Sequence, residues 1–427
     1  MDRMADTMFE LAELEAKTVD ELRALATEMQ LTGVSTAKKR DLCMKILAKQ
    51  SEQNGLSYRE GLLEVTNDGR GYLRVRGYGP DQAQDVYVAD SQIRRFDLRT
   101  GDLVSGPVRP PKDSERFWSL LRVQTINALS PQEVGTRPIF EELTPVYPNQ
   151  RLRLETDQPA NITGRVLDIV APIGRGQRGL IIAPPKAGKT TIIKQLANCL
   201  TKNYDDLHLM VLLIDERPEE VTDIARSVDG EVIASTFDEM PENHMKVAEL
   251  TLNRAKRLVE MGKDVVILLD SITRLARASN LTIEASGRTL SGGLDPAALY
   301  RPKRLLGAAR NIENGGSLTI MASILVETGS RMDEMIYEEF KATGNLDLRL
   351  SRELADRGIF PAVDISQTST RHQELLFSDE ELQSIWQLRK VLHAMDPIDA
   401  AETLVQGIRK TKTNSEFLTM ASQSFKR

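Results

Sequence analysis

The chain has 427 residues, 41% of them hydrophobic and 28% charged, which is enough for about two to four domains, each with its own core. Its formal net charge of −6 argues against a general polyanion-binding surface, so any contact with nucleic acid must be local. Two cysteines and four histidines rule out a disulfide framework and argue against a thiolate or histidine metal site. The sequence shows no membrane-spanning run and no signal peptide, and we predict a cytoplasmic protein without membrane contact.

The sequence of residues 1–50 predicts a small helical module. Thr18 and Glu21 have the spacing of a capping box, in which each side chain satisfies a backbone N–H of the other residue. Apolar residues then recur at helical spacing and define one buried face: Leu22, Leu25, Ala26 and Met29. Gly33 is expected to end this helix. The next helix carries a basic run at 38–40, which is compatible either with a contact to nucleic acid or with a solvated first turn.

Residues 51–127 change to short strand-like segments separated by turn residues, of which Asn67–Gly69 is a strong tight-turn signal. Five such segments in this length are typical of a small barrel of the oligonucleotide-binding, cold-shock-like type. All but one of the basic residues here are arginine, which stacks on bases and grips phosphates with a fork of donors. A nucleic-acid surface and a set of ordinary surface ion pairs both remain open.

Four prolines from Pro131 to Pro148 indicate an extended connector, and we place a linker at 128–160. From 161 to 427 apolar strands alternate with helical stretches, which is typical of a mostly parallel sheet covered by helices. The expected strands lie at 178–183, 208–215, 231–236, 264–270 and 317–326.

The stretch IIAPPKAGKT at 181–190 follows an expected strand and opens an amphipathic helix, the context that a phosphate-binding loop requires. Its backbone N–H groups and the positive helix end would hold the phosphates of ATP. Lys189 would reach the β and γ phosphates, and the Thr190 hydroxyl would bind Mg²⁺. Ala183 replaces the usual first glycine, which costs little if its φ stays negative. The predicted nucleotide-binding residues are Pro184, Pro185, Lys186, Ala187, Gly188, Lys189, Thr190 and Thr191.

Two further strands end in acidic residues, at the edge where open α/β sheets place their chemistry. The first, VVILLD, ends in Asp270, the acid expected to bind Mg²⁺ together with Thr190. The second, VLLIDER, ends in Asp215, Glu216 and Arg217. We assign Glu216 as the base that polarises the attacking water and Arg217 to the same catalytic group. A salt-bridging carboxylate at a strand end is the alternative for Glu216. With the loop, these acids predict a RecA-like phosphate-loop ATPase domain.

Several long motifs resemble the bacterial Rho family of transcription termination factors, and the resemblance runs through nearly the whole chain. They include PIGRGQRGLIIAPPKAGKTT, LLIDERPEEVTDIARSVDGEVIASTFDE, ILLDSITRLARASN and, in the barrel, VADSQIRRFDLRTGDLVSGPVRPPK. The resemblance implies a homohexameric ring that binds single-stranded RNA, hydrolyses ATP and moves 5′ to 3′ along the transcript. It also implies RNA polymerase and transcription elongation factors as partners.

The resemblance assigns further roles to matching positions. Arg371 in STSTRHQELL matches an arginine finger donated across a subunit interface, and Phe360 in IFPAVD matches a residue that packs on the adenine. Two loops match those that line the ring's pore and grip RNA: Arg288, Ser291, Gly292 and Gly293 in one, and Thr328, Gly329 and Arg331 in the other. In the barrel, the residues that match the primary RNA-binding surface are Asp68, Arg70, Tyr72, Arg74, Glu115, Arg116 and Phe117.

The chain departs from the family pattern at three places. Arg70 stands where the ribonucleoprotein-like motif usually has the first of two aromatics, which bears on the base preference of the barrel. Gly358 replaces a second interface arginine, and His372 with Gln373 replaces a lysine and a glutamate after the finger. These two departures bear on ATP-coupled contacts between subunits.

Three classes of function remain open. The first is an RNA-dependent ATPase motor, and the second is a subunit of a rotary or export-type ATPase, because rotary ATP synthase subunits share the PIGRGQR and DER elements. The third is an RNA-binding clamp that has lost turnover. Stimulation of ATP hydrolysis by RNA separates the first class from the second, and phosphate release with and without RNA separates the third.

Overall fold

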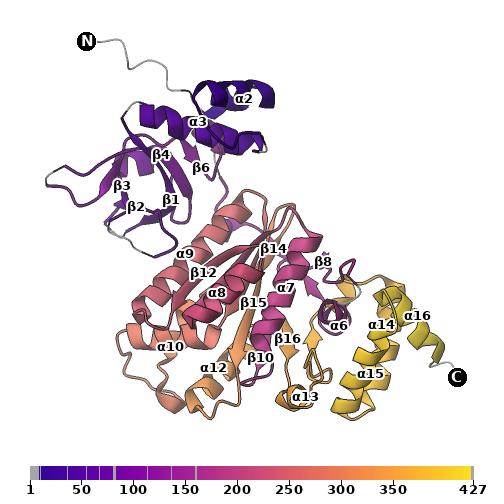
Figure 1. Ribbon diagram of the computed structural model, residues 1–427. Coiled ribbons are helices and arrows are strands. Elements are labelled where there is room, and N and C mark those ends of the chain that lie inside the picture. Colours follow the sequence, from indigo (N-terminus) through magenta and orange to yellow (C-terminus); the bar gives the residue numbers. More distant parts are fainter. Residues whose placement is uncertain are drawn as a thin grey trace, which may run out of the picture. The chain divides into compact units, whose positions relative to one another are not determined.

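The computed structural model divides the chain into two compact units, Met1–Pro138 with Leu250–Arg257, and Ile139–Glu249 with Leu258–Arg427 (Figure 1). The residues that the structure describes are 9, 11–35, 37–53, 55–66, 68–79, 83–112, 114–135, 137–158 and 161–424. Asn67, the first residue of the predicted tight turn, lies outside them.

The first unit begins with three helices, α1 (Leu11–Glu15), α2 (Val19–Glu28) and α3 (Lys39–Gln53). The capping box at the start of α2 is confirmed, because the Thr18 N–H donates to the Glu21 carboxylate and the Glu21 N–H donates to Thr18 Oγ1. The predicted end at Gly33 is wrong. Gln30 takes the left-handed conformation at φ 59°, and the Leu31 N–H reaches back to the Ala26 carbonyl. These two features close α2 at Glu28, as in a Schellman motif.

A closed five-stranded barrel follows, which confirms the oligonucleotide-binding type of fold. The strands run in the order β1-β2-β3-β5-β4, and β4 closes on β1 by antiparallel pairing. The last predicted strand is split into β5 and a short β6 that pairs with β4. The bounds in this region are β1 (Ser57–Val65), β2 (Gly71–Arg74), β3 (Val86–Val88), α4 (Asp90–Arg95), β4 (Leu103–Arg109), β5 (Trp118–Leu120), β6 (Thr125–Ile126) and α5 (Pro131–Val134).

The second unit contains a sheet in the order β12-β11-β13-β15-β10-β16-β17. All neighbouring pairs are parallel except the edge strand β17, as the alternation of strands and helices predicts. Its strands are β10 (Arg178–Ala183), β11 (His208–Glu216), β12 (Glu231–Thr236), β13 (Asp264–Asp270), β15 (Ser317–Leu325), β16 (Leu346–Arg349) and β17 (Ser369–Thr370). The same sheet is extended by β14 (Arg310–Ile312), which pairs with β15, and by β7 (Pro145–Val146), which pairs with β14. A separate two-stranded sheet is formed by β8 (Arg151–Leu152) and β9 (Ile173–Gly174).

Helices fill the connections between these strands (Figure 1). The α-helices are α6 (Ile162–Val170), α7 (Lys189–Asn203), α8 (Pro218–Ser227), α9 (Pro241–Glu260), α10 (Ile272–Thr282), α11 (Tyr300–Gly307), α12 (Arg331–Lys341), α13 (Arg352–Asp356), α14 (Asp379–His393), α15 (Pro397–Arg409) and α16 (Asn414–Ser424). Four short 3-10 helices complete the set: η1 (Phe140–Glu142), η2 (Ser291–Gly293), η3 (Pro296–Leu299) and η4 (Gln373–Leu375). In the described part of the chain, none of the helices is long and apolar enough to cross a membrane.

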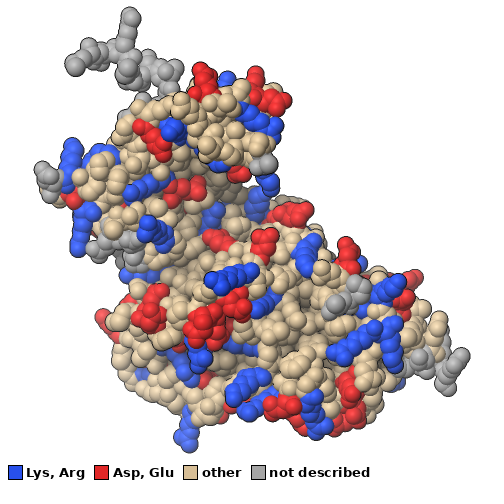
Figure 2. Space-filling model, viewed as in Figure 1, with Lys and Arg blue, Asp and Glu red and all other residues tan. Residues whose placement is uncertain are grey.

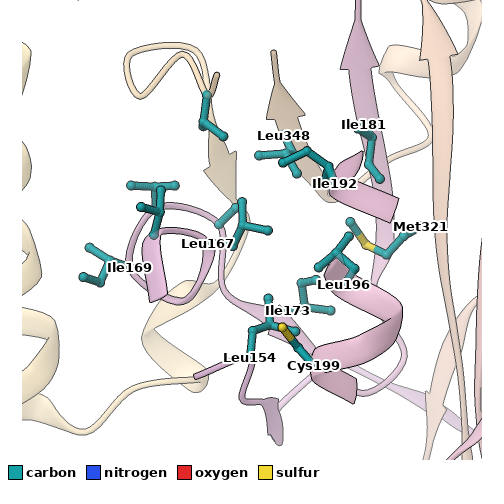
Figure 3. Close-up of a cluster of buried hydrophobic side chains, with 14 of the residues drawn as sticks. Leu154, Leu167, Ile169, Ile173, Ile181, Ile192, Leu196, Cys199, Met321 and Leu348 are labelled. Atoms are coloured by element: carbon teal, nitrogen blue, oxygen red, sulfur yellow. The ribbon is translucent and has the colours of Figure 1, made fainter. Parts of the chain in front are cut away.

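The largest core packs the sheet against α6, α7 and the C-terminal helices (Figure 3). Ile192 and Leu196 on α7 lie against strand residues such as Ile181 and Leu348, and Leu167 approaches the same space from α6. Cys199 is buried in this core and Cys43 in that of the N-terminal helices, as expected for structural thiols. The position of α7 is therefore fixed by packing, which matters because the phosphate loop runs into its first turn.

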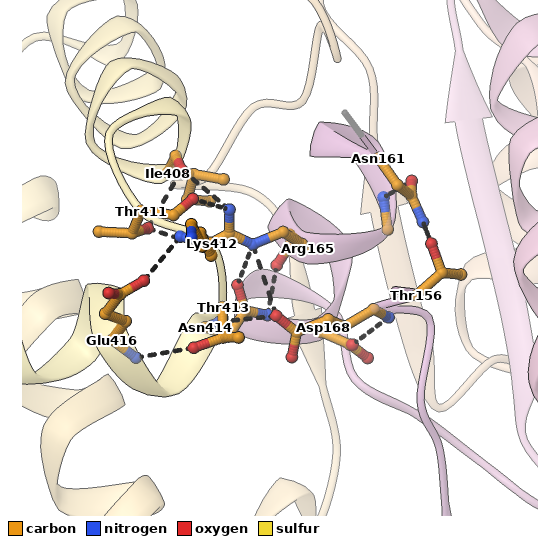
Figure 4. A network of polar contacts seen from close by, with 12 residues as sticks. Thr156, Asn161, Arg165, Asp168, Ile408, Thr411, Lys412, Thr413, Asn414 and Glu416 are labelled. Carbon is orange, nitrogen blue, oxygen red and sulfur yellow. Dashed lines mark hydrogen bonds and ion pairs between the residues drawn. The ribbon is translucent and has the colours of Figure 1, made fainter. Parts of the chain in front are cut away.

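A buried guanidinium holds the C-terminal helices to the rest of the unit (Figure 4). The side chain of Arg165 on α6 is fully buried and donates to the backbone carbonyls of Ile408 and Thr411 and to the Asn414 side chain, at 2.7 to 3.1 Å. Asn414 in turn donates to the Arg165 carbonyl. These carbonyls belong to the turn between α15 and α16, where helix ends leave acceptors without helical partners.

We predict that Arg165→Met lowers the free energy of unfolding of the second unit by about 3 kcal/mol, because the buried acceptors of the turn lose their donor. The control is Arg153→Met, an exposed arginine expected to change stability by less than about 0.5 kcal/mol. Urea unfolding followed by the fluorescence of Trp386, with Trp118 replaced by Phe in all proteins, measures the effect. Equal midpoints for both variants would contradict the assigned role.

Candidate nucleotide site and nucleic-acid interface

The predicted phosphate loop runs from β10 into α7. Ala183 is the last residue of β10 and pairs with Leu325, so it is extended and needs no glycine. The turn is made instead at Lys186 and Gly188, both with positive φ at 66° and 86°. No side chain caps the first turn of α7, so its backbone N–H groups are available to an anion.

Three ionisable groups meet beside this loop. The Lys189 ammonium forms ion pairs with Asp270 and, at 3.3 Å, with Glu216. Both carboxylates are almost fully buried, at 1% and 3% exposure, and come from the adjacent strand ends of β13 and β11. Asp270 also accepts a hydrogen bond from Ser323 Oγ at 2.8 Å. The residues predicted as phosphate-binding lysine, metal-binding acid and base therefore lie together.

The environment of Glu216 suits a general base. Burial raises the pKa of Glu216 above its usual value, and the nearby Lys189 opposes that shift. A carboxylate with a raised pKa holds a proton more strongly than an exposed one, which favours proton abstraction near neutral pH. Arg274 on α10 also approaches Glu216 at 3.3 Å, so Glu216 has the ion pairs that the alternative of a salt-bridging carboxylate predicts.

A bulge in β11 turns Glu216 inward. Asp215 has a φ of 57°, and the pairing with β12 shifts between Ile214 and Glu216. The extra residue leaves Asp215 with 40% of its side chain exposed while Glu216 is buried. Arg217 follows as the exposed N-cap of α8 and does not join the buried cluster.

The donor set at this edge fits Mg²⁺ bound together with a nucleotide. Thr190 offers a hydroxyl in the first turn of α7, and Asp270 offers a carboxylate, both of them hard oxygen ligands. Over the residues that the structure describes, no cluster of three or more histidine, cysteine or acidic side chains could hold a metal. Mg²⁺ is usually held by one or two carboxylates plus substrate phosphates, and Asp270 is one such carboxylate.

Phe360 lies next to the phosphate loop. A Cβ atom added to Gly188 would stand 3.8 Å from the Phe360 ring, which is 49% exposed and open to a ligand. The nearby Gly358 has a φ of 73° and ends α13, with the Ile359 N–H bonded to the Leu354 carbonyl. An arginine at this position would adopt a strained backbone, which glycine avoids.

Arg371 lies at the edge where the parallel strands begin, opposite the edge that carries Lys189, Glu216 and Asp270. It follows β17, whose Thr370 pairs with Leu346 at the start of β16, and Leu346 pairs with Gly179 near the start of β10. The phosphate loop begins at the other end of β10, roughly 17 Å away, because the six residues of this strand span five steps of about 3.3 Å. Arg371 is exposed and does not join the cluster formed by Lys189, Glu216 and Asp270 of its own chain.

The two predicted pore loops lie side by side. A Cβ added to Gly292 would clash with the backbone of Met332 at 2.4 Å, so only glycine allows this approach. Asp333 organises the second loop: it is buried, accepts a hydrogen bond from Thr328 Oγ1 at 2.6 Å, and pairs with both ends of the Arg277 fork. The other loop residues, Arg288, Ser291, Gly293, Gly329 and Arg331, are exposed.

Helix α10 joins these loops to the nucleotide cluster. It begins directly after Asp270 and Ser271, and its first turn contributes Arg274, which contacts Glu216. About one turn later, Arg277 forms an ion pair with Asp333. One short stretch of this helix therefore contacts both the candidate base and a candidate RNA loop.

The barrel presents a group of aromatic rings. Tyr72 lies edge-on to Phe117 at 5.0 Å and to Tyr87 at 6.1 Å between ring centroids. A groove of about 830 Å³ runs alongside and is lined by Tyr87, Arg109, Glu115, Arg116 and Phe117, among other residues. These rings are half-buried, and accessible rings beside arginines are what a single-stranded nucleic acid needs for stacking and phosphate contacts.

The charged residues of the barrel are mostly paired. Arg74 is largely buried between Asp85 and Glu64, so its charge is already balanced. Glu115 accepts two hydrogen bonds from Arg109, which lowers the pKa of Glu115 to about 2. Arg70 pairs with Asp68 at 3.2 Å, but both side chains are more than half exposed. An exposed pair of this kind is weak, so Arg70 can exchange Asp68 for a phosphate.

Sequence reasoning missed Tyr87 and Arg109 on this surface and the buried Asp85 that pairs with Arg74. A signal existed for Tyr87, because it alternates with buried valines in β3 and stands opposite Tyr72 in the ladder. Over the face seen in Figure 2, basic and acidic side chains are intermingled, in keeping with the small net charge.

Known proteins similar to this chain cover both units. Family models match at 13–55 (Rho termination factor, N-terminal domain), 59–132 (Rho termination factor, RNA-binding domain) and 164–370 (ATP synthase alpha/beta family, nucleotide-binding domain). The transcription termination factor Rho of Bacillus subtilis (strain 168) is 54% identical over 97% of both chains. That of Escherichia coli (strain K12) is 51% identical over 97% of this chain and all of the relative.

Solved structures show the same fold in the second unit. The ATPase EscN from the type III secretion system of enteropathogenic E. coli matches with a TM-score of 0.53 at 21% identity, over 74% of this chain and 79% of its own. The ATP synthase-type nucleotide-binding domain makes the second unit an ATPase domain, and the N-terminal and RNA-binding domains precede it. With a helical module, an RNA-binding barrel and this ATPase domain, and with full-length relatives more than half identical, the chain belongs to the Rho family of transcription termination factors.

Proposed function

We propose that the protein is an RNA-dependent ATP hydrolase that moves 5′ to 3′ along nascent RNA and releases it from RNA polymerase. The observation that carries this proposal is helix α10, which contacts the candidate base through Arg274 and a candidate RNA loop through Arg277. A shift of the loop on RNA would move the helix, and with it the group that faces Glu216. Hydrolysis and RNA grip would thus be coupled through one element.

The proposed nucleotide is ATP with Mg²⁺. The loop 184–191 would hold the phosphates, Phe360 would pack on the adenine, and Thr190 with Asp270 would bind the metal. Bound Mg²⁺ supplies charge neutralisation at the β and γ phosphates. Lys189 would leave its acidic partners for the phosphates, and Glu216 would then be free to accept a proton from water. Arg217 would act at the rim of the site, as an exposed cation near the phosphates.

The proposed assembly is a homohexameric ring. Its support is the position of Arg371, which lies at the sheet edge opposite the phosphate loop and would reach the loop of a neighbouring subunit. Such a head-to-tail contact closes into a ring when the rotation per subunit permits. Single-stranded RNA would bind the barrel and pass the loops around Arg288 and Thr328, and we propose elongation factors and RNA polymerase as further partners in the cytoplasm. The domain limits 1–50, 51–127, 128–160 and 161–427 are part of the same proposal.

The deciding experiment measures ATP hydrolysis by the full chain with poly(C), with poly(U) and without RNA. The proposal expects little hydrolysis without RNA and strong stimulation by at least one polymer. Equal rates in all three would favour the rotary or export-type ATPase, to which the fold of the second unit is also similar. No hydrolysis under any condition, with RNA still bound, would favour a clamp without turnover.

We predict that Glu216→Gln lowers kcat at least about a hundredfold while ATP affinity stays within about twofold, because the amide keeps the shape but cannot accept the proton. Glu219→Gln, an exposed glutamate in the first turn of α8, is the matched control and should retain its rate. RNA-stimulated phosphate release and ATP binding are measured on the same preparations. A rate for Glu216→Gln near that of the wild type would remove this residue from the mechanism.

A second prediction concerns the sharing of the site between subunits. Lys189→Ala should abolish hydrolysis because it removes a phosphate-binding cation, and Arg371→Ala should lower kcat by a factor on the order of 10³ or more because it removes the finger. Mixed rings should regain activity wherever an intact loop faces an intact finger. Assembly of mixed rings is verified with two affinity tags. Confirmed mixed rings without activity would mean that Arg371 works within its own subunit or not at all.

A third prediction concerns Arg70 in the barrel. If Arg70 contacts a phosphate, Arg70→Phe should flatten the slope of log affinity against log salt by about 0.7 and preserve or sharpen pyrimidine preference. Filter binding of short oligonucleotides across a salt series, without ATP, measures the slope. Arg23→Phe, an ion-paired arginine on α2, is the control. An unchanged slope with unchanged preference would show that Arg70 only pairs with Asp68.

A further inference from the structure

The segment that carries Arg371 is held on both sides. Before it, Thr370 pairs with β16 and its hydroxyl donates to the Pro172 carbonyl at 2.9 Å. The Arg371 N–H donates to the Asn345 carbonyl, also at 2.9 Å. After it, His372 adopts the left-handed conformation with φ 53° and ψ 36°. That conformation is unfavourable for a residue with a side chain, so it persists only where surrounding contacts impose it.

The contact that holds His372 comes from the connector. The ring of Tyr147 lies 4.6 Å from the His372 ring between centroids, at an interplanar angle of 50°. His372 Nδ1 is also 3.1 Å from Glu374 Oε1. Tyr147 directly follows β7, which is anchored by its pairing with β14, so the tyrosine is presented from an ordered strand.

A second contact joins the same two segments. A Cβ at Gly174 would lie 2.7 Å from Pro148 and 2.8 Å from Leu376, so this glycine leaves room for the residue after Tyr147 and the segment after His372. Pro148 of the connector and Leu376, four residues after His372, therefore both pack against Gly174. Tyr147 is nevertheless 64% exposed, which is more than a residue with a purely structural role in a core would be.

From this geometry we propose that Tyr147 is a positioning residue for Arg371, acting through His372. The inference rests on the proposed role of Arg371 as a finger. The contact between the Tyr147 and His372 side chains holds His372 in its left-handed conformation. It thereby fixes the direction in which the Arg371 side chain leaves the sheet edge. An arginine that stabilises a transition state must arrive in one geometry, and loss of that restraint lowers the rate without changing the binding of ATP.

The test is the steady-state rate of RNA-stimulated ATP hydrolysis by the full chain. Tyr147→Ala is expected to lower kcat about two- to tenfold, the range for loss of one aromatic pair, with the KM for ATP within about twofold. Tyr147→Phe keeps the ring and should retain the wild-type rate. Tyr300→Ala removes a tyrosine of similar exposure outside the site and should also retain it.

A double mutant separates positioning from a general structural effect. If Tyr147 acts only through Arg371, then Tyr147→Ala should cost nothing further in an Arg371→Ala background, measured at high enzyme concentration. A wild-type kcat for Tyr147→Ala, an equal loss in Tyr147→Phe, or the same fold loss in the Arg371→Ala background would each overturn the proposal. Failure of the proposed function looks different: Arg371→Ala itself would then hydrolyse ATP at the wild-type rate.

Discussion

The chemistry of the second unit depends on the parallel direction of β10, β11, β13 and β15. Because these strands run the same way, their carboxyl ends meet at one edge, and that edge collects Lys189, Glu216 and Asp270 from three separate stretches of sequence. The same constraint sends the segment ending in Arg371 to the opposite edge, since β17 returns antiparallel beside β16. A complete hydrolytic site therefore cannot be formed by this sheet within one chain if Arg371 takes part.

Buried charge at this edge is balanced within the chain. Asp270 and Glu216 lie almost out of reach of water, and Lys189 and Arg274 form ion pairs with them. Two buried acids without these cations would be costly, so the ion pairs stabilise the surrounding fold. In the proposed function, the phosphates and the metal ion of a bound nucleotide would compete for the same partners. Binding would then exchange one set of ion pairs for another.

Much of this arrangement could be predicted from the sequence. Apolar runs ending in acids located β11 and β13 to within one residue, and the Thr18–Glu21 spacing identified a real capping box. The contacts that could not be predicted from the sequence are those between segments far apart in the chain. Asp85 neutralises Arg74, and Tyr147 meets His372, only because strands and loops far apart in the chain are brought together. The end of α2 was missed because Gln30 takes a conformation that local propensity reserves for glycine.

If Arg371 acts in the proposed ring as a finger for a neighbouring subunit, its place at the sheet edge opposite the phosphate loop sets the number of complete sites. In any open row of subunits, one terminal loop has no finger facing it and one terminal finger faces nothing, so complete sites always number one fewer than subunits. Only closure of the row into a ring makes the number of complete sites equal to the number of subunits. Opening of the ring for an RNA strand to enter would therefore inactivate the one site at the break, while the other sites stay complete. The break, wherever it occurs, would give identical chains unequal roles.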